Sequence, residues 1–309
     1  MSTASAEVNY PDQLSLDYAY YSPQSLIIKN HGWLEEALEE HDVEVNWVHS
    51  RGSNNSLEFL NSRATSFALT SSVSAFISRA NGQPVKTIYS YLWSEPSALV
   101  VTEDSEITSI AEIEGKTVAA TKGTDPYFFL LRALEANQLE PSDVSIVHLQ
   151  HPDGKTALEQ GRVDVWAGLD PHMAAAELAG NRFIYRNPEF GLGASLNTTE
   201  NFLRDYPDAV TLVLETYERA RQWIIDNPDE TAQLVADETQ LPVEVIQLQL
   251  GRYKFDSPIP DERFIAAIEP VVPLLQADGI LRRNADVEGA LNSLVDTTLI
   301  DKLLEGESP

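Results

Sequence analysis

Short runs of β-branched and aromatic residues alternate with amphipathic stretches over the first two thirds of the chain. The amphipathic stretches open on Ser, Thr, Asp or Pro, which are preferred where helices begin. This alternation is typical of strand–helix units that build parallel sheets, so it predicts an α/β fold. We expect strands near residues 14–20, 43–49, 66–69, 85–91, 98–102, 117–120, 144–149, 163–167 and 183–185. We expect helices at residues 23–30, 56–63, 72–80, 126–137, 155–160 and 171–179.

The pattern changes in the last third, where strand-like runs stop. Four prolines there precede helical runs, as proline does at a first helical turn: Pro207, Pro228, Pro242 and Pro260. Residues 197–309 are therefore expected to be wholly helical. No Gly/Ser-rich linker separates the regions, so short and structured segments are expected to join them.

The chain has 309 residues, with 48 Asp and Glu against 21 Lys and Arg, and a formal net charge of −27. This length suggests two domains. A field this negative repels phosphate backbones and anionic lipid headgroups, so nucleic-acid binding and electrostatic membrane anchoring are not expected. About half of the excess negative charge falls in residues 197–309, outside the region where the site is expected.

Cysteine is absent, which excludes disulfide frameworks, zinc–thiolate sites, iron–sulfur clusters and every mechanism with a cysteine nucleophile. Residues 1–7 carry neither a basic segment nor an apolar run, so they are not expected to form a secretory leader. Either the protein acts in the cytosol or a leader has been removed. No apolar run approaches the ~20 residues of a membrane-spanning helix.

Four strand-to-helix turns place hydroxyl or amide side chains where a helix begins, at residues 21–25, 50–56, 70–72 and 121–127. Helix N-termini offer free N–H groups and a positive dipole, which suit an anion. Ligands of open α/β sheets bind at the carboxyl ends of the strands, where all four turns fall, so together they predict a small-anion site. For any single turn the simpler interpretation is an ordinary N-cap, and only the recurrence favours a site.

The remaining motifs do not require catalysis, a metal or a nucleotide. Six histidines lack metal-ligand spacing, and His148 and His151 are expected to be a surface pair. The glycines at 191 and 193 are too few for a dinucleotide fingerprint. Trp93 and Trp166 stand near strand ends, where a tryptophan either lines a ligand cleft or packs in the core.

An ordered series of segments resembles the substrate-binding proteins of ABC importers, in the aliphatic sulfonate, taurine and nitrate branch. The segments span nearly the whole chain: Asn30-His31-Gly32, Gly52-Ser53-Asn54, Ala68-Leu69-Thr70-Ser71-Ser72, residues 107–118, Thr121-Lys122-Gly123-Thr124, and residues 158–166 before Asp170-Pro171. The resemblance implies a two-lobed periplasmic-binding-protein type II fold with two hinge crossings and a helical C-terminal region. Residues 1–95 and 197–309 would form lobe one, and residues 96–196 lobe two.

The resemblance also implies which residues hold the ligand between the lobes. Helix N-termini of both lobes would hold its oxyanion, through Ser22, Gln24, Ser71, Ser72, Lys122, Gly123 and Thr124. Further cleft-lining residues would be Tyr21, Ser25, Arg51, Ser53 and Asn54. The organic tail would be surrounded by Trp93, Tyr127, Trp166 and Asp170.

Two residues depart from the family pattern. Pro23 removes one N–H donor from the first-lobe turn, and Asp125 places a carboxylate at the start of the anion-binding helix. Asp125 either caps its helix or pairs with an amine on a zwitterionic sulfonate such as taurine. The identity of the organic tail therefore stays open.

By resemblance the chain is a non-enzymatic receptor that captures an alkanesulfonate or taurine-like anion by hinge closure and presents it to an ABC permease. It would be a monomer in the periplasm or outside the cell, with no cofactor, metal or nucleic acid. Alternatives are a receptor for nitrate, bicarbonate, an aromatic carboxylate or a pyrimidine precursor of thiamine, or an enzyme or sensor on the same fold. A sulfinate desulfinase resembles this family but uses a cysteine nucleophile, which this chain lacks.

Overall fold

The structure, a computed structural model, describes residues 9–95 and 97–306. The first part contains β1 (Gln13–Tyr18), α1 (Pro23–His31), α2 (Trp33–Leu38), β2 (Glu44–His49), α3 (Ser53–Asn61), β3 (Phe67–Ser71), α4 (Ser72–Ala80) and β4 (Val85–Ser94). The middle part contains β5 (Ala98–Val101), β6 (Thr117–Ala120), α5 (Asp125–Ala136), β7 (Ser145–His148), α6 (His151–Glu159), β8 (Val165–Ala167), α7 (His172–Leu178) and β9 (Arg182–Arg186).

The last part begins with β10 and is otherwise mostly helical. It contains β10 (Leu192–Thr199), α8 (Glu200–Asp205), α9 (Pro207–Asp226), α10 (Pro228–Thr239), α11 (Val243–Gly251), β11 (Tyr253–Lys254), α12 (Glu262–Ala266), α13 (Val272–Ala277), α14 (Val287–Ser293) and α15 (Thr298–Glu305). Short 3-10 turns occupy Glu39–His41, Ile110–Glu112, Pro141–Asp143, Pro188–Phe190 and Glu269–Val271.

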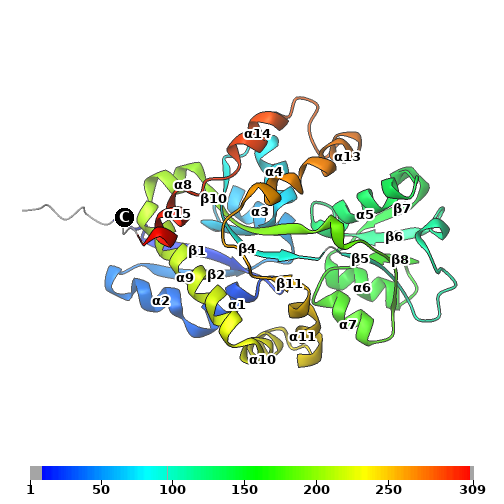
Figure 1. Ribbon diagram of the computed structural model, residues 1–309, viewed down its shortest axis with the longest axis horizontal. Coiled ribbons are helices and arrows are strands. Elements are labelled where there is room, and N and C mark those ends of the chain that lie inside the picture. The colour runs from blue at the N-terminus through cyan, green and yellow to red at the C-terminus, as the bar shows by residue number, and fades with distance from the viewer. Residues whose placement is uncertain (1–8, 96, 307–309) are drawn as a thin grey trace, which may run out of the picture.

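The strands gather at two ends of the molecule, and β4 and β10 run along its middle (Figure 1). We call the body built on β1, β2, β3, β4 and β10 the first lobe, and the body built on β5 to β9 the second lobe. In the first lobe β1 pairs in parallel with β2, while β11, β4, β10 and β3 form a second sheet. The second lobe has one sheet, in the order β7-β6-β8-β5-β9.

Neither larger sheet is wholly parallel: the four-stranded sheet of the first lobe is antiparallel throughout, and the five-stranded sheet of the second lobe is mixed. In the first lobe β10 runs antiparallel to both β3 and β4, and in the second lobe β5 runs antiparallel to β8 and β9. β6 pairs in parallel with β7 and β8, as the strand–helix pattern predicts. β5 and β10 are the strands that the chain enters just after it crosses between the lobes. The local alternation of hydrophobic and polar residues does not predict the direction of β5 and β10, because no helical crossover precedes either strand.

The chain crosses between the lobes twice, from β4 to β5 and from β9 to β10. The second crossing precedes the boundary expected at residues 196–197, because β10 already starts at Leu192 and pairs with β3 and β4. β10 escaped prediction because its sequence, LGASLNTT, is poor in aromatic residues and has no period of two. Its neighbours on both sides bury it, so its strand conformation depends on sheet pairing.

The last third differs from the expected all-helical region at the end of β10, residues 197–199, and at β11. β11 pairs with β4 at Tyr253 and Lys254, and so brings a residue of this region to the lobe interface. The prolines behave as expected at Pro207 and Pro228, which occupy the first turns of α9 and α10. α11 packs against α7 of the second lobe, as well as against α10.

Two helices begin earlier than the pattern predicts. α3 starts at Ser53 rather than residue 56, and α6 at His151 rather than residue 155. The helix α2 was not predicted at all; it follows α1 after Gly32, whose positive φ of 64° ends α1 in a left-handed cap. The early starts matter for function, since they bring Gly52 and His151 to the interface between the lobes.

Apolar faces of the helices close the cores of both lobes. α5 buries Phe128, Leu131 and Leu134, which lie three residues apart on one face and pack in a cluster with strands of the second lobe and with α12–α14. A separate cluster joins α1, α2 and α9 to β1, β3 and β4 in the first lobe. α5 is thereby packed on its apolar face, and the turn before it contacts the first lobe through Gly123.

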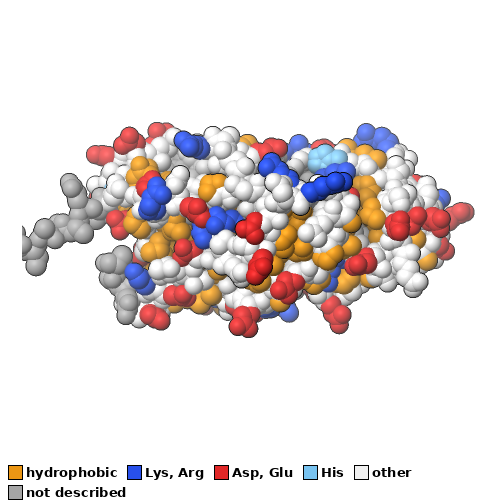
Figure 2. All heavy atoms as spheres, turned by 90° about the horizontal axis from the view of Figure 1, so that it is seen from above, with side chains coloured by type: hydrophobic (Ala, Val, Ile, Leu, Met, Phe, Trp, Pro, Cys, Tyr) orange, Lys and Arg blue, Asp and Glu red, His pale blue; other side chains and the backbone are white. Residues whose placement is uncertain are grey.

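Acidic side chains are spread across the face seen in Figure 2, with Lys and Arg interspersed among them. The net charge of −27 is therefore not concentrated in one patch on this face. In the described part of the chain, residues 9–95 and 97–306, no helix has the length and apolar character needed to cross a membrane.

Candidate functional site

A narrow cavity, partly open to solvent, lies between the lobes. The first lobe with β11 and the first crossing contributes Tyr21, Gly52, Ser53, Ser71, Tyr91, Leu92, Ser94, Glu95, Ser97, Ala194 and Tyr253. The second lobe contributes Thr124, Asp125, His151, Leu169, Asp170 and Met173. A ligand in this cavity contacts both lobes at once.

Four helices begin at the cavity wall. Gly52 and Ser53 start α3, and Ser71 is the N-cap of α4 in the first lobe. Asp125 and His151 are the first residues of α5 and α6 in the second lobe. The first N–H groups of a helix lack intrahelical partners and carry partial positive charge, so the cavity has the character of an anion site without containing a Lys or Arg in its described lining.

Neutral hydrogen bonds link the two lobes at this wall. The Ser53 Oγ accepts from the Ser71 N–H at 3.1 Å, and the hydroxyls of Ser71 and Ser74 are 2.9 Å apart. Ser74 Oγ then donates to the carbonyl oxygen of Gly123 in the second lobe, at 3.0 Å. The turns predicted from their hydroxyl side chains therefore meet across the interface.

Gly52 is a point of close approach between the lobes. A Cβ atom at this position would lie 2.8 Å from Asn54 Oδ1 in α3, and 3.2 Å from His151 Nε2 and 3.3 Å from Thr124 Cγ2 in the second lobe. The φ angle of 163° is ordinary extended backbone, so glycine is not needed there for conformation. It is needed for space, because a larger residue pushes against the Asn54 side chain and against the second lobe.

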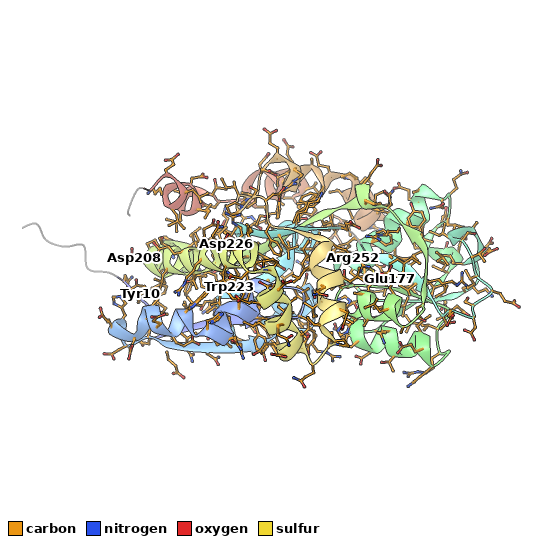
Figure 3. The ribbon with its side chains drawn as sticks, turned by 60° about the horizontal axis from the view of Figure 1, so that its bottom comes forward. Tyr10, Glu177, Asp208, Trp223, Asp226 and Arg252 are labelled. Carbon is orange, nitrogen blue, oxygen red and sulfur yellow. The ribbon has the colours of Figure 1, made fainter. Side chains whose placement is uncertain are left out.

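Three carboxylates line the cavity, and two of them have an arginine partner. Asp170, 5% exposed, receives two hydrogen bonds from Arg252 Nη1 at 2.8 and 3.0 Å and one from the Ala174 N–H at 2.9 Å. Arg252 also pairs with Glu177 of α7, and Figure 3 shows these two side chains together where α11 meets α7. Glu95 pairs with Arg186.

Asp125 is the lining carboxylate that has no such partner among the described residues. Its Oδ1 is shielded from solvent and has no hydrogen-bond partner there. Burial raises the pKa of Asp125 to about 7, from an ordinary value of 3.8, and a hydrogen bond from the Ser71 hydroxyl acts against that rise. Burial therefore disfavours the ionised form of this carboxyl.

His151 is 2% exposed, so the expected surface pair with His148 is wrong. Only His148 is exposed, and its Nδ1 accepts from the backbone N–H of Lys122 at 3.0 Å. His151 Nδ1 lies 3.1 Å from Thr121 Oγ1, and burial lowers its pKa to about 3. The ring is neutral, and the position at the start of α6 rather than at a strand end explains its burial. The described residues contain no cluster of three or more metal-ligating side chains.

Asp17 of β1 holds together segments that line the cavity, although the sequence analysis did not identify it. Its carboxylate is buried and accepts from Ser50 Oγ at 2.8 Å, Ser56 Oγ at 2.5 Å and the Leu69 N–H at 3.0 Å. These bonds tie the turn after β2, the helix α3 and the strand β3 to β1. Burial raises the pKa of Asp17 to about 6, with the three donors acting against that rise.

Five of the predicted ligand residues line the cavity: Tyr21, Ser53, Ser71, Thr124 and Asp170. The other residues of the first turn are buried behind it. Ser22 caps α1, and Ser25 Oγ donates to the Ser22 carbonyl oxygen at 2.8 Å. Gln24 Nε2 donates to the carbonyl oxygen of Tyr91. The structure thus gives these three residues roles within the first lobe.

Four further predicted residues stand around the entrance or behind the wall. Arg51 is half-exposed and pairs with Asp153 of α6 at 2.9 Å. Ser72 and Asn54 each have a shielded oxygen without a partner in the described structure. Lys122 is exposed and lies 5.6 Å above the ring of Tyr127.

The remaining predicted residues lie outside the cavity lining. The carbonyl oxygen of Gly123 receives the interlobe bond from Ser74. The hydroxyl of Tyr127 donates to Asp278 at 2.8 Å, so its ring points toward α13. Trp166 is 1% exposed and packs in the core, and Trp93 packs under Arg263 at 4.2 Å. None of these aromatic rings forms the wall that the resemblance implied.

Sequence reasoning missed Tyr91, Tyr253 and His151. Tyr91 lies inside a predicted strand, so its position at the cavity depends on which face of β4 meets the second lobe. Tyr253 belongs to β11, a two-residue strand with no periodicity of its own. The alternation of β4 could have indicated Tyr91. Tyr253 and His151 had no such local signal, because contacts distant in sequence place them at the cavity.

The model of the NMT1/THI5-like family matches residues 26–231, which is two thirds of the chain. The chain belongs to the NMT1/THI5-like family. Among curated relatives, a protein of Bacillus subtilis (strain 168) named as an aliphatic sulfonates-binding protein is 27% identical over 92% of this chain and 85% of its own length. An Escherichia coli (strain K12) protein of the same name is 28% identical over 79% of this chain and 76% of its own length.

Solved structures show that this NMT1/THI5-like chain has the periplasmic-binding-protein fold. The alkanesulfonate-binding protein of Xanthomonas axonopodis pv. citri, bound to MOPS, matches with a TM-score of 0.83 at 22% identity, over 94% of this chain and all of that chain. The desulfurization enzyme DSZB also matches, with a TM-score of 0.69 at 14% identity, over 96% of this chain and all of that chain. The α/β two-lobed fold implied by the sequence resemblance is confirmed. The same fold carries both binding proteins and an enzyme, so fold alone does not decide the activity.

Proposed function

We propose that this chain is the solute-binding receptor of an ABC importer and captures an aliphatic sulfonate between its two lobes by hinge closure. The observation that carries the proposal is the meeting of four helix N-termini, two from each lobe, at one interlobe cavity. The names of the Bacillus and Escherichia coli relatives favour a sulfonate as the anion.

A ligand shifts a hinge equilibrium only if it binds one state more tightly than the other. Here α3 and α4 belong to the first lobe, while α5 and α6 belong to the second. An oxyanion held by both pairs gains its full set of N–H contacts only when the lobes meet. Binding therefore favours the closed form, which a membrane permease can recognise.

The receptor is proposed to act without catalysis and as a monomer, on the outer side of the cytoplasmic membrane. The relatives that match by sequence are named as binding proteins, which supports the first point. The chain contains no cysteine, so it cannot form the cysteine nucleophile expected of a sulfinate desulfinase.

A thermal-shift panel tests the proposal. It compares taurine and short and long alkanesulfonates with nitrate, bicarbonate, phosphate and pyrimidine precursors of thiamine. A ligand at 100 times its dissociation constant stabilises the protein by about 2.7 kcal/mol, which is easily measured. We expect sulfonates to raise the midpoint. Stabilisation by nitrate or a pyrimidine, together with no response to any sulfonate, would sink the proposal.

A further inference from the structure

Three histidines lie along the interface between the lobes, and each has a shielded ring nitrogen without a hydrogen-bond partner among the described residues. His49 ends β2 in the first lobe, while His151 and His172 begin α6 and α7 in the second lobe. The unpartnered atom is Nε2 in all three rings, which we call the histidine seam. A shielded polar atom without a partner is costly, so packing alone does not account for three of them along one interface. The seam is not a metal site, since no three ligating side chains in residues 9–95 and 97–306 converge to hold a metal ion.

Residues of the first lobe contact both histidines of the second lobe. The ring of Tyr20, in the turn after β1, has its centroid 5.8 Å from that of His172 and 4.6 Å from that of His49. Gly52 approaches the other ring, because a Cβ atom there would lie 3.2 Å from His151 Nε2. Separation of the lobes would therefore remove these neighbours and give the rings access to water.

The bonding of Thr121 shows why His151 resists protonation. Thr121 Oγ1 has one hydrogen, which it donates to the carbonyl oxygen of Leu149 at 2.7 Å. Its 3.1 Å contact with His151 Nδ1 therefore has the histidine as donor, and the lone pair of the neutral ring lies on Nε2. A second proton would have to bind Nε2, which no hydrogen-bond partner from the described residues reaches. The geometry of the closed interface thus favours the neutral ring.

Burial keeps the rings of the histidine seam neutral. It lowers the pKa of His151 to about 3 and that of His172 to about 4, and it also lowers the pKa of His49 from the ordinary 6.5. A histidine that is buried in the closed form and solvated in the open form binds protons more tightly in the open form. It therefore takes up a proton when the lobes part at acidic pH.

The charged groups that face the seam mostly act in the same direction. Neighbours from three elements lower the pKa values of its histidines further: Arg51 in the turn after β2, Lys155 of α6 and His148 at the end of β7. Asp153 of α6 opposes the shift at His172. Tyr20 stays protonated, because burial raises its pKa. The surroundings of the seam therefore disfavour positive charge on its rings.

We propose that the histidine seam makes closure of the lobes pH-dependent, so that acidification opens the receptor and releases its ligand. Near neutral pH the three rings are uncharged and the lobes close over them. Below about pH 6 the open form takes up protons that the closed form excludes, so closure has to displace them and the ligand binds less tightly. The inference rests on the proposed function, because it concerns regulation of the same hinge closure.

Asp125 titrates in the opposite direction and has to be separated from the seam. Burial raises its pKa to about 7, with a hydrogen bond from the Ser71 hydroxyl of the first lobe acting against that rise. When the lobes part, this carboxyl is solvated and loses its proton, so Asp125 by itself favours closure at acidic pH. The pH dependence of affinity sums both effects, whereas the pKa of a single histidine reports on the seam alone.

NMR titration of the histidine rings, in the ligand-free and in the ligand-saturated protein, tests the inference. Ethanesulfonate and taurine serve as ligands, since both keep their charges between about pH 5 and pH 8. We expect the pKa of His172 to lie near about 6.5 in the ligand-free protein and below about 5.5 in the saturated one. Equal pKa values in the two states would overturn the inference and leave the sulfonate receptor standing. Binding of neither compound at any pH would overturn both.

The variant His172→Phe sharpens the test, with His41→Phe as a matched change at an exposed histidine outside the interface. The measured quantity is the ratio of the dissociation constants at pH 5 and pH 7.5, to which Asp125 contributes equally in every variant. His172→Phe should lower this ratio at least about fivefold relative to the wild type, because one proton is no longer displaced on closure. His41→Phe should leave the ratio unchanged. The wild-type ratio in His172→Phe would contradict the role of the seam, and the NMR titration of the wild type decides the matter if the variant does not fold.

Discussion

Two carboxylates of the same cavity lining have opposite surroundings. Asp170 is buried with Arg252, which donates two hydrogen bonds to it and holds α11 against the second lobe. Asp125 has a shielded oxygen and forms no ion pair with an arginine among the described residues. The difference indicates a division of labour. A carboxylate whose cation is built into the fold supports the structure, and one without a cation is available to a ligand.

The largest effect is expected at the paired carboxylate. Arg252→Met leaves Asp170 buried without its cation, which costs about 3–5 kcal/mol of folding free energy for a broken buried ion pair. Urea unfolding measures the loss. The double variant Arg252→Met with Asp170→Asn removes both charges and should recover most of the stability. A single variant as stable as the wild type would show that the pair is not structural.

A wedge at the interlobe cavity should remove binding without this loss of stability. In Gly52→Val the new side chain pushes against His151 and Thr124 across the interface, so closure is hindered. We expect affinity for sulfonates to fall at least about tenfold, or ~1.4 kcal/mol. Gly251→Val is the control, since a Cβ there meets no atom within 4 Å. Unchanged sulfonate affinity in Gly52→Val would place the ligand elsewhere.

The pH dependence of stability should reveal the cost of ionising Asp125. Its pKa of about 7 in the folded state exceeds the ordinary 3.8, so its contribution is present at low pH and lost as pH rises through 7. Asp125→Asn should therefore gain stability over the wild type by at least ~1 kcal/mol near pH 8.5, but not near pH 4. Thermal unfolding without ligand checks this. A difference that stays constant with pH would contradict the raised pKa.

The smallest effect is expected at the exposed ion pair across the entrance. Arg51 and Asp153 are 43% and 55% exposed, so water screens their attraction. Arg51→Ala should cost less than about 1 kcal/mol in stability. The same urea experiment compares it directly with Arg252→Met. A loss as large as that of the buried pair would mean that exposure does not separate the two interlobe contacts.

Much of the fold could be predicted from local patterns and resemblance. Strands β1 to β9 overlap the expected runs, since each carries β-branched or aromatic residues of its own. β10 and β11 could not be predicted in this way, because pairing with β4 holds them in place. The two-lobed fold itself came from resemblance to a family, not from periodicity.

The residues of the candidate site also divide into those that a local pattern predicts and those that distant contacts place. Ser53, Ser71 and Thr124 were predictable, because hydroxyl residues at helix starts have a local physical cause. The partner of Asp170 was not, since Arg252 lies 82 residues away in sequence. Trp166 and Tyr127 were expected at the ligand and instead lie in the core or toward α13, because aromatic residues near strand ends serve either purpose.

A calorimetric titration of taurine into the wild-type protein near pH 8 tests the central claim most directly. The account predicts one binding site per chain and an affinity that Gly52→Val weakens but Gly251→Val does not. The absence of binding heat from taurine and from every alkanesulfonate, at protein and ligand concentrations where the thermal shift is also nil, would contradict it.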